Sequence, residues 1–235
     1  MTGMMSQPGS PVPDLTNLWL SERPESTPDP DTLHLWSINL DRSDFRRYLS
    51  QDELTRASRF TLETPKSRFI AGRSALRSIL GHYLAIPPLS VRLKYGDHGK
   101  PELADQAGDI HFNLAHSGPL AILAVSCGSP VGVDVEKIQS RRYMLGIAER
   151  MFSRENFTLL ESLSGSARTR LFCHLWTGLE ARHKCLGTGL FTPTLASEDA
   201  MPCWVNFIPE PGFCGAISMQ KEIPKTENWT GFKFQ

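Results

Sequence analysis

Two acidic side chains stand two residues apart in the segment Gly132-Val133-Asp134-Val135-Glu136. Because side chains alternate between the two faces of a β-strand, Asp134 and Glu136 would project from one face and the valines from the other. Mg²⁺ takes one or two such carboxylates together with water and substrate phosphate oxygens. The same pattern also occurs on ordinary solvated strands, so the pair alone leaves a structural role open.

A second group of chemically useful residues lies in the segment 176–184, which reads Trp-Thr-Gly-Leu-Glu-Ala-Arg-His-Lys. On a helix, Trp176, Glu180 and Lys184 share one face, because residues four apart lie one above the other. The carboxylate and the ammonium would complete a metal site and offset phosphate charge. A surface ion pair beside a core tryptophan is the alternative interpretation of the same spacing.

A third group is Asn113 with His116, Ser117 and Gly118. We expect the last three residues to form a turn between two strands. Such a turn would present backbone N–H groups and an imidazole to an anion. A plain polar hairpin turn explains the same residues equally well.

Hydrophobic periodicity, caps and turn signals predict the elements that position these groups. We expect strands at 32–40, 91–95, 110–113, 121–126, 131–136, 203–208, 216–219 and around Phe232. We expect helices at 44–48, 50–60, 65–84, 144–151, 153–163 and 168–185. Ser50 and Glu53 have the spacing of a capping box at the second helix.

Both halves follow the same order of strand, helices and further strands. This order predicts an α+β protein of two similar subdomains, 32–130 and 131–235. Residues 1–31 are rich in Pro, Ser and Asp. We expect them to form a loosely ordered extension that packs through Leu18, Trp19 and Leu20.

Composition excludes several classes of protein. The 25 basic and 25 acidic residues balance, which argues against a protein that coats nucleic acid. No apolar run approaches the ~20 residues that span a bilayer, and the start does not have the pattern of a signal peptide. The five cysteines are odd in number and form no C-x-x-C pair, which favours reduced thiols in the cytoplasm.

The three groups occur in a specific order: F-N-L-A-H-S-G at 112–118, G-V-D-V-E at 132–136, and W-T-x-x-E-A-x-x-K-x-x-G-x-G-L from 176. Together with the segments 53–60, 72–77 and 98–101, they resemble the 4′-phosphopantetheinyl transferase superfamily in its longer single-chain form. The likeness covers roughly residues 32 to 219. It implies two similar halves related by a pseudo-two-fold axis, with the active site in the cleft between them.

The resemblance also implies a reaction and its partners. The phosphopantetheine arm of coenzyme A would pass to a serine of an apo acyl or peptidyl carrier protein, with Mg²⁺ as cofactor. Adenosine 3′,5′-bisphosphate would leave. A monomer is expected, because both halves lie in one chain, and no membrane or nucleic acid is expected as a partner. The stretch around Arg141 to Phe152 is a candidate landing surface for the carrier.

The resemblance assigns roles residue by residue. Asp134, Glu136 and Glu180 match magnesium ligands, and Glu180 also matches the base that takes the serine proton. Lys184 matches the lysine that meets the phosphates, and Asp134, Glu180 and Lys184 form the expected catalytic set. The remaining expected contacts to coenzyme A are Arg56 and His116 at its phosphates, and Gly99, Lys100 and Asn113 along its site.

Two positions depart from the family pattern. Leu179 stands where the family usually has Lys or Arg, and Ala115 stands where it often has Ser. The loss of a cation and a hydroxyl leaves open a family member that binds coenzyme A or a carrier without catalysing transfer. A magnesium nuclease or phosphohydrolase is a further alternative, since two acids with a distant Glu and Lys would serve it too. The identity of the carrier is not determined by the sequence.

Overall fold

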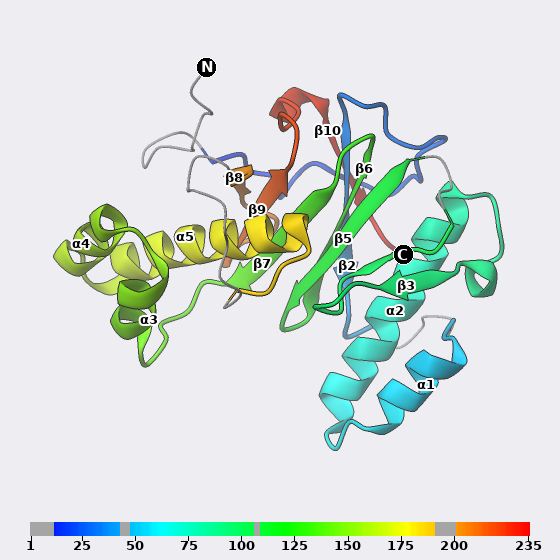
Figure 1. The fold of residues 1–235 in the computed structure, drawn as a ribbon, viewed down its shortest axis with the longest axis horizontal. Helices are drawn as coiled ribbons and strands as arrows, with labels where there is room; N and C mark the ends of the chain where they lie inside the picture. The colour runs from blue at the N-terminus through cyan, green and yellow to red at the C-terminus, as the bar shows by residue number, and fades with distance from the viewer. Residues whose placement is uncertain (1–11, 43–47, 106–108, 191–200) are drawn as a thin grey trace.

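The computed structural model describes residues 12–42, 48–105, 109–190 and 201–235. Helices and sheets are mixed, and the chain forms an N-terminal and a C-terminal subdomain, each built on one antiparallel or mixed sheet with a long helix against it (Figure 1). The α+β prediction is confirmed.

The N-terminal sheet has five strands in the order β1-β10-β2-β6-β5. Their bounds are β1 Trp19–Leu20, β10 Trp229–Lys233, β2 Leu33–Asn39, β6 Leu120–Cys127 and β5 Ile110–Ser117. β10 pairs in parallel with both β1 and β2, while β2, β6 and β5 pair antiparallel. The N-terminal sheet therefore contains the last strand of the chain.

Two helices accompany this sheet, α1 Gln51–Ser58 and α2 Glu63–Tyr83. The capping box predicted at α1 is confirmed: the Ser50 side chain accepts from the Glu53 backbone N–H, and the Glu53 side chain accepts from the Ser50 N–H. α2 begins two residues before the predicted start at Pro65, at Glu63.

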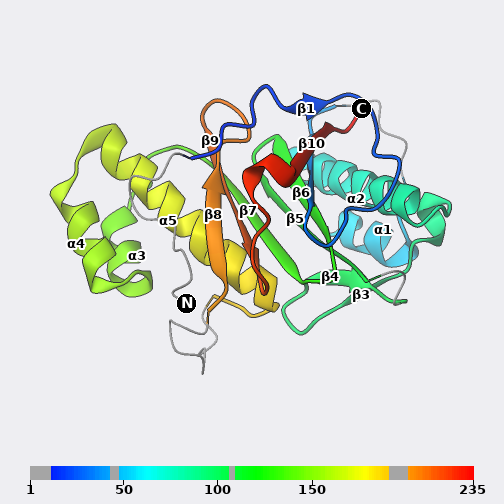
Figure 2. The same ribbon diagram turned by 90° about the horizontal axis from the view of Figure 1, so that it is seen from above.

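The C-terminal sheet has three antiparallel strands in the order β7-β9-β8. They are β7 Val131–Lys137, β9 Phe213–Met219 and β8 Cys203–Phe207. The helix α5, Gly165–Leu186, lies along this sheet (Figure 2). Gly187 ends α5 in the left-handed conformation with φ 70°, which glycine commonly adopts at the end of a helix.

Alternating side chains explain how the layers stack. On β2, Trp36 and Ile38 join one core with α2, whereas Leu33 and Leu35 join a second core. That second core also contains Val131, Val133 and Val135 of β7. The order of layers is therefore α2, the five-stranded sheet, the three-stranded sheet and α5, and the central strands bury both faces.

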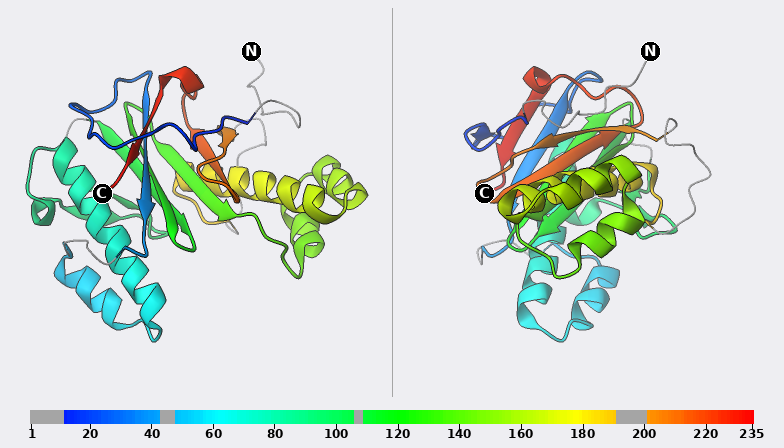
Figure 3. Two further views of the ribbon diagram at one scale, coloured as in Figure 1. Left: turned by 180° about the vertical axis from the view of Figure 1, so that it is seen from behind. Right: turned by 90° about the vertical axis from the view of Figure 1, so that its left-hand side faces the viewer.

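Smaller elements lie outside these layers. α3 Met144–Met151 and α4 Arg154–Ser162 form a lobe at the end of α5 that is remote from the sheets (Figures 1 and 3). β3 Leu93–Tyr95 and β4 Pro101–Leu103 form a hairpin, and the 3-10 turns η1 Pro88–Ser90 and η3 Thr226–Asn228 complete the described elements. No helix among the described residues is long and apolar enough to cross a membrane.

The predicted turn at His116-Ser117-Gly118 is wrong. β5 continues through Ser117, which pairs with Leu120 of β6, so the turn consists of Gly118 and Pro119. Gly118 has φ 59°, a conformation that glycine adopts without strain. His116 therefore projects from a strand. The helix predicted at 44–48 falls largely outside the described residues.

Residues 12–31 run along the outer side of the molecule. Leu15 is buried in the second core, and the Trp19 indole N–H donates to the Pro209 carbonyl at 2.9 Å. Trp19 packs as expected, whereas Leu18 and Leu20 stay about half exposed.

Candidate active site

The acid-bearing face of β7 lies directly against α5. Gly132 makes this approach possible, because a Cβ there would overlap the Ala181 carbonyl oxygen and the Cys185 amide nitrogen. The valines of β7 face the second core, and Asp134 and Glu136 face the helix side. The residues that sequence spacing placed on one face of β7 and one face of α5 thus meet at a single junction.

Lys184 joins the two elements at this junction. Its ammonium donates to Asp134 Oδ1 at 2.6 Å and lies 3.8 Å from Glu180 Oε2 one turn earlier on α5. The Asp134 side chain is 7% exposed, whereas that of Lys184 is 32% exposed. The lysine side chain is therefore partly exposed, while the carboxylate that its ammonium contacts is buried.

Burial and charge both shift the titration of this cluster. Burial raises the pKa of Asp134 to about 7; Lys184 opposes the shift, and the like charges of Glu180 and Glu136 add to it. Burial also raises the pKa of Glu180. Burial works to lower the pKa of Lys184, but the attraction of Asp134 and Glu180 outweighs it, so the net direction is upward. The cluster holds more negative charge than its one lysine neutralises.

Glu136 is held by two further side chains. Ser117 of β5 donates its hydroxyl to Oε2 at 2.9 Å, and the Arg141 guanidinium lies 2.7 Å from Oε1. Arg141 in turn lies over the rings of Phe172 and Trp176, at 5.8 and 5.7 Å from their centroids. Arg141 thereby connects the α3–α4 lobe and the start of α5 to the acid cluster.

His116 lies beside the cluster at the end of β5. Partial burial lowers its pKa, and the nearby cations Lys184 and Arg68 lower it further. Arg68 itself makes a paired contact to Asp41, with N–O distances of 2.7 and 2.9 Å. His116 therefore lies within electrostatic range of Lys184 and Glu136.

The oxygen atoms of Asp134, Glu136 and Glu180 can be compared with the ligands that a divalent cation prefers. Among the described residues, no three His, Cys, Asp or Glu side chains are already arranged around one metal-sized point. However, the buried Asp134 Oδ2 has no hydrogen-bond partner, and Glu136 and Glu180 crowd it with like charge. Hard carboxylate oxygens with uncompensated negative charge are the donor set that Mg²⁺ prefers, so the residues fit such an ion.

Two residues expected along the coenzyme A site lie in the joint between the subdomains. The Asn113 side chain is 4% exposed, and its Oδ1 accepts from the Val133 backbone N–H at 2.9 Å. Lys100 donates to the carbonyls of Val131 and Cys185 at 3.3 and 3.2 Å. Gly99, with φ 76°, forms the turn before Lys100. Their contacts to coenzyme A stay predictions.

Arg56 lies on α1 in a separate group of cations and rings. Its guanidinium lies 5.3 Å from the Phe69 centroid, and that of Arg73 lies 5.7 Å from Phe69 and 5.6 Å from Tyr95. Arg73 Nη1 is buried without a hydrogen-bond partner. Arg56 is thus near a second basic residue, but its predicted phosphate contact is not tested.

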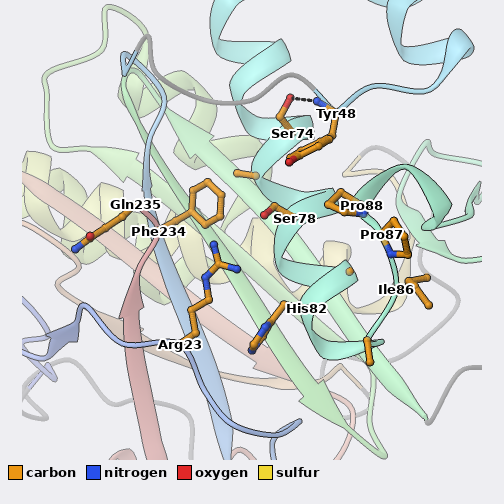
Figure 4. A pocket seen from close by; sticks show the side chains of 13 residues that line it. Arg23, Tyr48, Ser74, Ser78, His82, Ile86, Pro87, Pro88, Phe234 and Gln235 are labelled. Carbon is orange, nitrogen blue, oxygen red and sulfur yellow. Dashed lines mark hydrogen bonds between the residues drawn. The ribbon is translucent and has the colours of Figure 1, made fainter.

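Two cavities open on the described surface. One, of about 700 Å³, is lined by both subdomains, including Lys100, Phe112, Pro130 and Gly187, and adjoins the end of α5. The other, of about 820 Å³, lies between α2 and the residues Phe234 and Gln235. Figure 4 shows Arg23, His82 and Phe234 around it. Neither cavity is lined by the residues of the acid cluster, but the first reaches α5 at Cys185, directly after Lys184.

Several side chains of the site were not predicted from the sequence. Ser117 was assigned to the turn, and Arg141 only to a landing surface for the carrier. Arg73 lies in the segment 72–77 that belongs to the resemblance, but no role was predicted for it. Its place on the helix was a usable signal, since a charged residue on the buried face of a helix needs a partner or a ligand. Arg141 carries no periodic relation to Glu136, so nothing local marks it.

Comparisons with known proteins agree with this arrangement. Residues 37–128 match the family model "4′-phosphopantetheinyl transferase, N-terminal", and residues 130–208 match "4′-phosphopantetheinyl transferase superfamily". The 4′-phosphopantetheinyl transferase HetI of Nostoc sp. is 34% identical over 224 residues, covering 87% of this chain and 94% of the relative.

A second relative is the 4′-phosphopantetheinyl transferase Sfp of Bacillus subtilis. It is 30% identical over 149 residues, covering 63% of this chain and 65% of the relative. The matches extend across both subdomains and include the acid cluster of β7 and α5. The chain belongs to the 4′-phosphopantetheinyl transferase superfamily, in its longer single-chain form.

Proposed function

We propose that this protein transfers the phosphopantetheine arm of coenzyme A to a serine of an apo acyl or peptidyl carrier protein. Family membership supports the reaction class. The observation that carries the proposal is the junction of β7 and α5, where Lys184 bridges Asp134 and Glu180. A crowded acid cluster with one partly exposed lysine suits a polyphosphate substrate with a divalent metal.

The reaction breaks one bond and forms one. The serine oxygen attacks the phosphorus next to the pantetheine arm, the bond from that phosphorus to the bridging oxygen breaks, and adenosine 3′,5′-bisphosphate leaves. The serine proton goes to Glu180. Because burial raises the pKa of Glu180, its carboxylate is a better proton acceptor than an exposed one.

Positioning and charge supply the remainder of the rate enhancement. The ammonium of Lys184 binds the substrate phosphates, and His116 adds a hydrogen-bonding group beside it. Asp134, Glu136 and Glu180 would hold Mg²⁺, which when bound neutralises pyrophosphate charge. The cavity between the subdomains has room for part of coenzyme A and lies next to the turn of α5 that carries Lys184.

A second candidate is a family member that binds coenzyme A or a carrier without transfer. Leu179 favours it, because an apolar, half-buried side chain stands where the family usually has a cation. Arg141 argues against it, since its guanidinium contacts Glu136 and acts electrostatically on Glu180. Positive charge is therefore present near the acids despite Leu179.

The deciding experiment weighs carrier proteins. The protein is incubated with coenzyme A, Mg²⁺ and a panel of apo carriers from fatty acid, polyketide and peptide synthesis. We expect one carrier or more to gain the mass of one phosphopantetheine, and a chelator to abolish the gain. Binding of coenzyme A with no gain on any carrier would establish the binder. Hydrolysis of phosphodiesters without coenzyme A binding would establish a nuclease or phosphohydrolase.

We further propose a cytoplasmic monomer. Both subdomains that build the acid cluster come from one chain, so no second copy is needed to complete it. Cys173, Cys185 and Cys214 are buried free thiols, which suits a reducing compartment.

The Arg141–Phe152 stretch, where Tyr143 is exposed, stays our candidate surface for the carrier.

A further inference from the structure

Lys100 connects three parts of the molecule that are far apart in the sequence. It lies at the end of the loop between β3 and β4, in the N-terminal subdomain. Its ammonium donates to Val131 O at 3.3 Å and to Cys185 O at 3.2 Å, both in the C-terminal subdomain. One side chain thus bonds to the first residue of β7 and to the last turn of α5.

These two carbonyls belong to the segments that carry the acid cluster. Val131 lies three residues before Asp134 on β7, and Cys185 directly follows Lys184 on α5. β7 and α5 meet directly at Asp134 and Lys184, 2.6 Å apart. Lys100 provides a second tie between the same two elements, beyond the close contact that Gly132 allows.

The chemistry of the acceptors explains why a lysine suits this place. The last carbonyls of a helix have no partner within the helix and carry partial negative charge. Gly187 N–H satisfies Lys184 O, Thr188 N–H satisfies His183 O, and Lys100 satisfies Cys185 O. Lys100 therefore caps α5 from the other subdomain.

This arrangement has an energetic cost. Burial lowers the pKa of Lys100, which shows that desolvation of the ammonium opposes its charged form. Its two hydrogen bonds go to neutral carbonyls and not to a carboxylate. A partly buried cation with this set of partners serves geometry more than charge neutralisation.

We propose that Lys100 is a positioning residue that fixes α5 against β7 and thereby sets the separation of Glu180 and Lys184 from Asp134. This inference rests on the proposed transfer reaction for its kinetic consequence, but not for its structural one. It differs from the role that resemblance implies for Lys100, a contact to coenzyme A. The two roles predict different measurements.

The experiment compares Lys100→Met with Lys94→Met in the whole protein. Lys94 lies in the same hairpin, is exposed and pairs with Glu102 at 3.7 Å, so it is a matched control for hydrogen exchange, whereas it lines the same cavity as Lys100 and is not used as a control for KM. The first readout is hydrogen exchange of the protein without substrate or metal. We expect amides of the last turn of α5 and the start of β7 to exchange about tenfold faster or more in Lys100→Met only.

The second readout is transfer kinetics. A positioning role predicts that kcat falls by about tenfold or more and that the Mg²⁺ concentration for half-maximal rate rises, while KM for coenzyme A stays within about twofold. A direct contact predicts the reverse: KM for coenzyme A rises, kcat is kept, and exchange without substrate is unchanged. That second pattern would overturn the proposal.

Two additions keep the test decisive. Lys100→Gln keeps a donor at the joint, so it should fold and show smaller changes of the same kind if Lys100→Met is too unstable to measure. If even the unaltered protein modifies no carrier, the proposed function fails, but hydrogen exchange still tests whether Lys100 holds α5 against β7. Unchanged exchange in both Lys100 variants would refute that positioning role.

Discussion

Each subdomain contains a buried ion pair, and the two pairs differ in their surroundings. In the N-terminal subdomain, Arg77 and Glu53 lie 2.7 Å apart, with side chains 4% and 2% exposed. In the C-terminal subdomain, Lys184 and Asp134 lie 2.6 Å apart, with side chains 32% and 7% exposed. In each pair one carboxylate oxygen has no hydrogen-bond partner. Distance and burial of the acid therefore do not distinguish them.

The neighbours do distinguish them. Glu53 Oε2 also closes the capping box of α1, and Arg77 also donates to Val91 O at 2.7 Å, so that pair ties α1, α2 and a loop together. Asp134 is crowded by Glu136 and Glu180, and the side chain of its lysine is partly exposed. Hydrogen bonds that join several elements of the fold mark a pair that stabilises it, whereas like-charge crowding around a pair with a partly exposed lysine marks a pair kept for a ligand.

The largest expected effect tests the crowded pair. Asp134→Asn keeps the shape and an acceptor for Lys184 but removes the charge that the metal needs. We expect the rate of carrier modification to fall by about 1,000-fold or more, with Tm changed by less than about 5 °C. Carrier mass and calorimetry measure the two quantities. A normal rate would show that Asp134 is no metal ligand.

The Glu53–Arg77 pair should respond in the opposite way. Glu53→Gln leaves the Arg77 cation buried without its counter-charge, so we expect a loss of about 3 kcal/mol in the free energy of unfolding. The transfer rate of the folded fraction should be unchanged. Urea denaturation gives the first value, and adding Arg77→Met should restore part of the loss. A large drop in rate with full stability would place this pair in the substrate site.

A substitution at Leu179 tests the effect of a further cation beside the crowded pair. Leu179→Lys adds positive charge one residue before Glu180, so we expect an equal rate or one up to about tenfold faster. Steady-state kinetics measure the change, and Leu179→Met controls for altered shape. A sharp loss of activity and stability in the lysine variant alone would mean that Leu179 is required as packing, and that the family pattern does not apply there.

The smallest expected effect comes from Ala85, two residues after the end of α2, the helix that carries Arg77. Ala85 is exposed and has φ 51°, a conformation that favours glycine. Ala85→Gly should raise the free energy of unfolding by about 0.5–1 kcal/mol without a change in rate. A change in transfer rate here would contradict the separation of stability from catalysis between the two regions.

Much of the fold could be predicted from local patterns. β7, α3 and α5 lie where periodicity and caps placed them, and Asp134, Glu136, Glu180 and Lys184 face one another across the β7–α5 junction. The extent of β5 could not be predicted in this way. β5 continues to Ser117 because it pairs with β6 as far as the turn, and strand pairing depends on a distant partner that local propensity does not include.

Strand alternation and helical periodicity depend only on near neighbours in the chain, so they were enough to group the acids and the lysine by face. Which face meets which depends on contacts between distant segments. Those contacts tie Arg141 and Ser117 to Glu136, carry Lys100 across to α5, and return β10 to the first sheet. Such contacts form only when the layers stack, because packing and burial decide them and spacing does not.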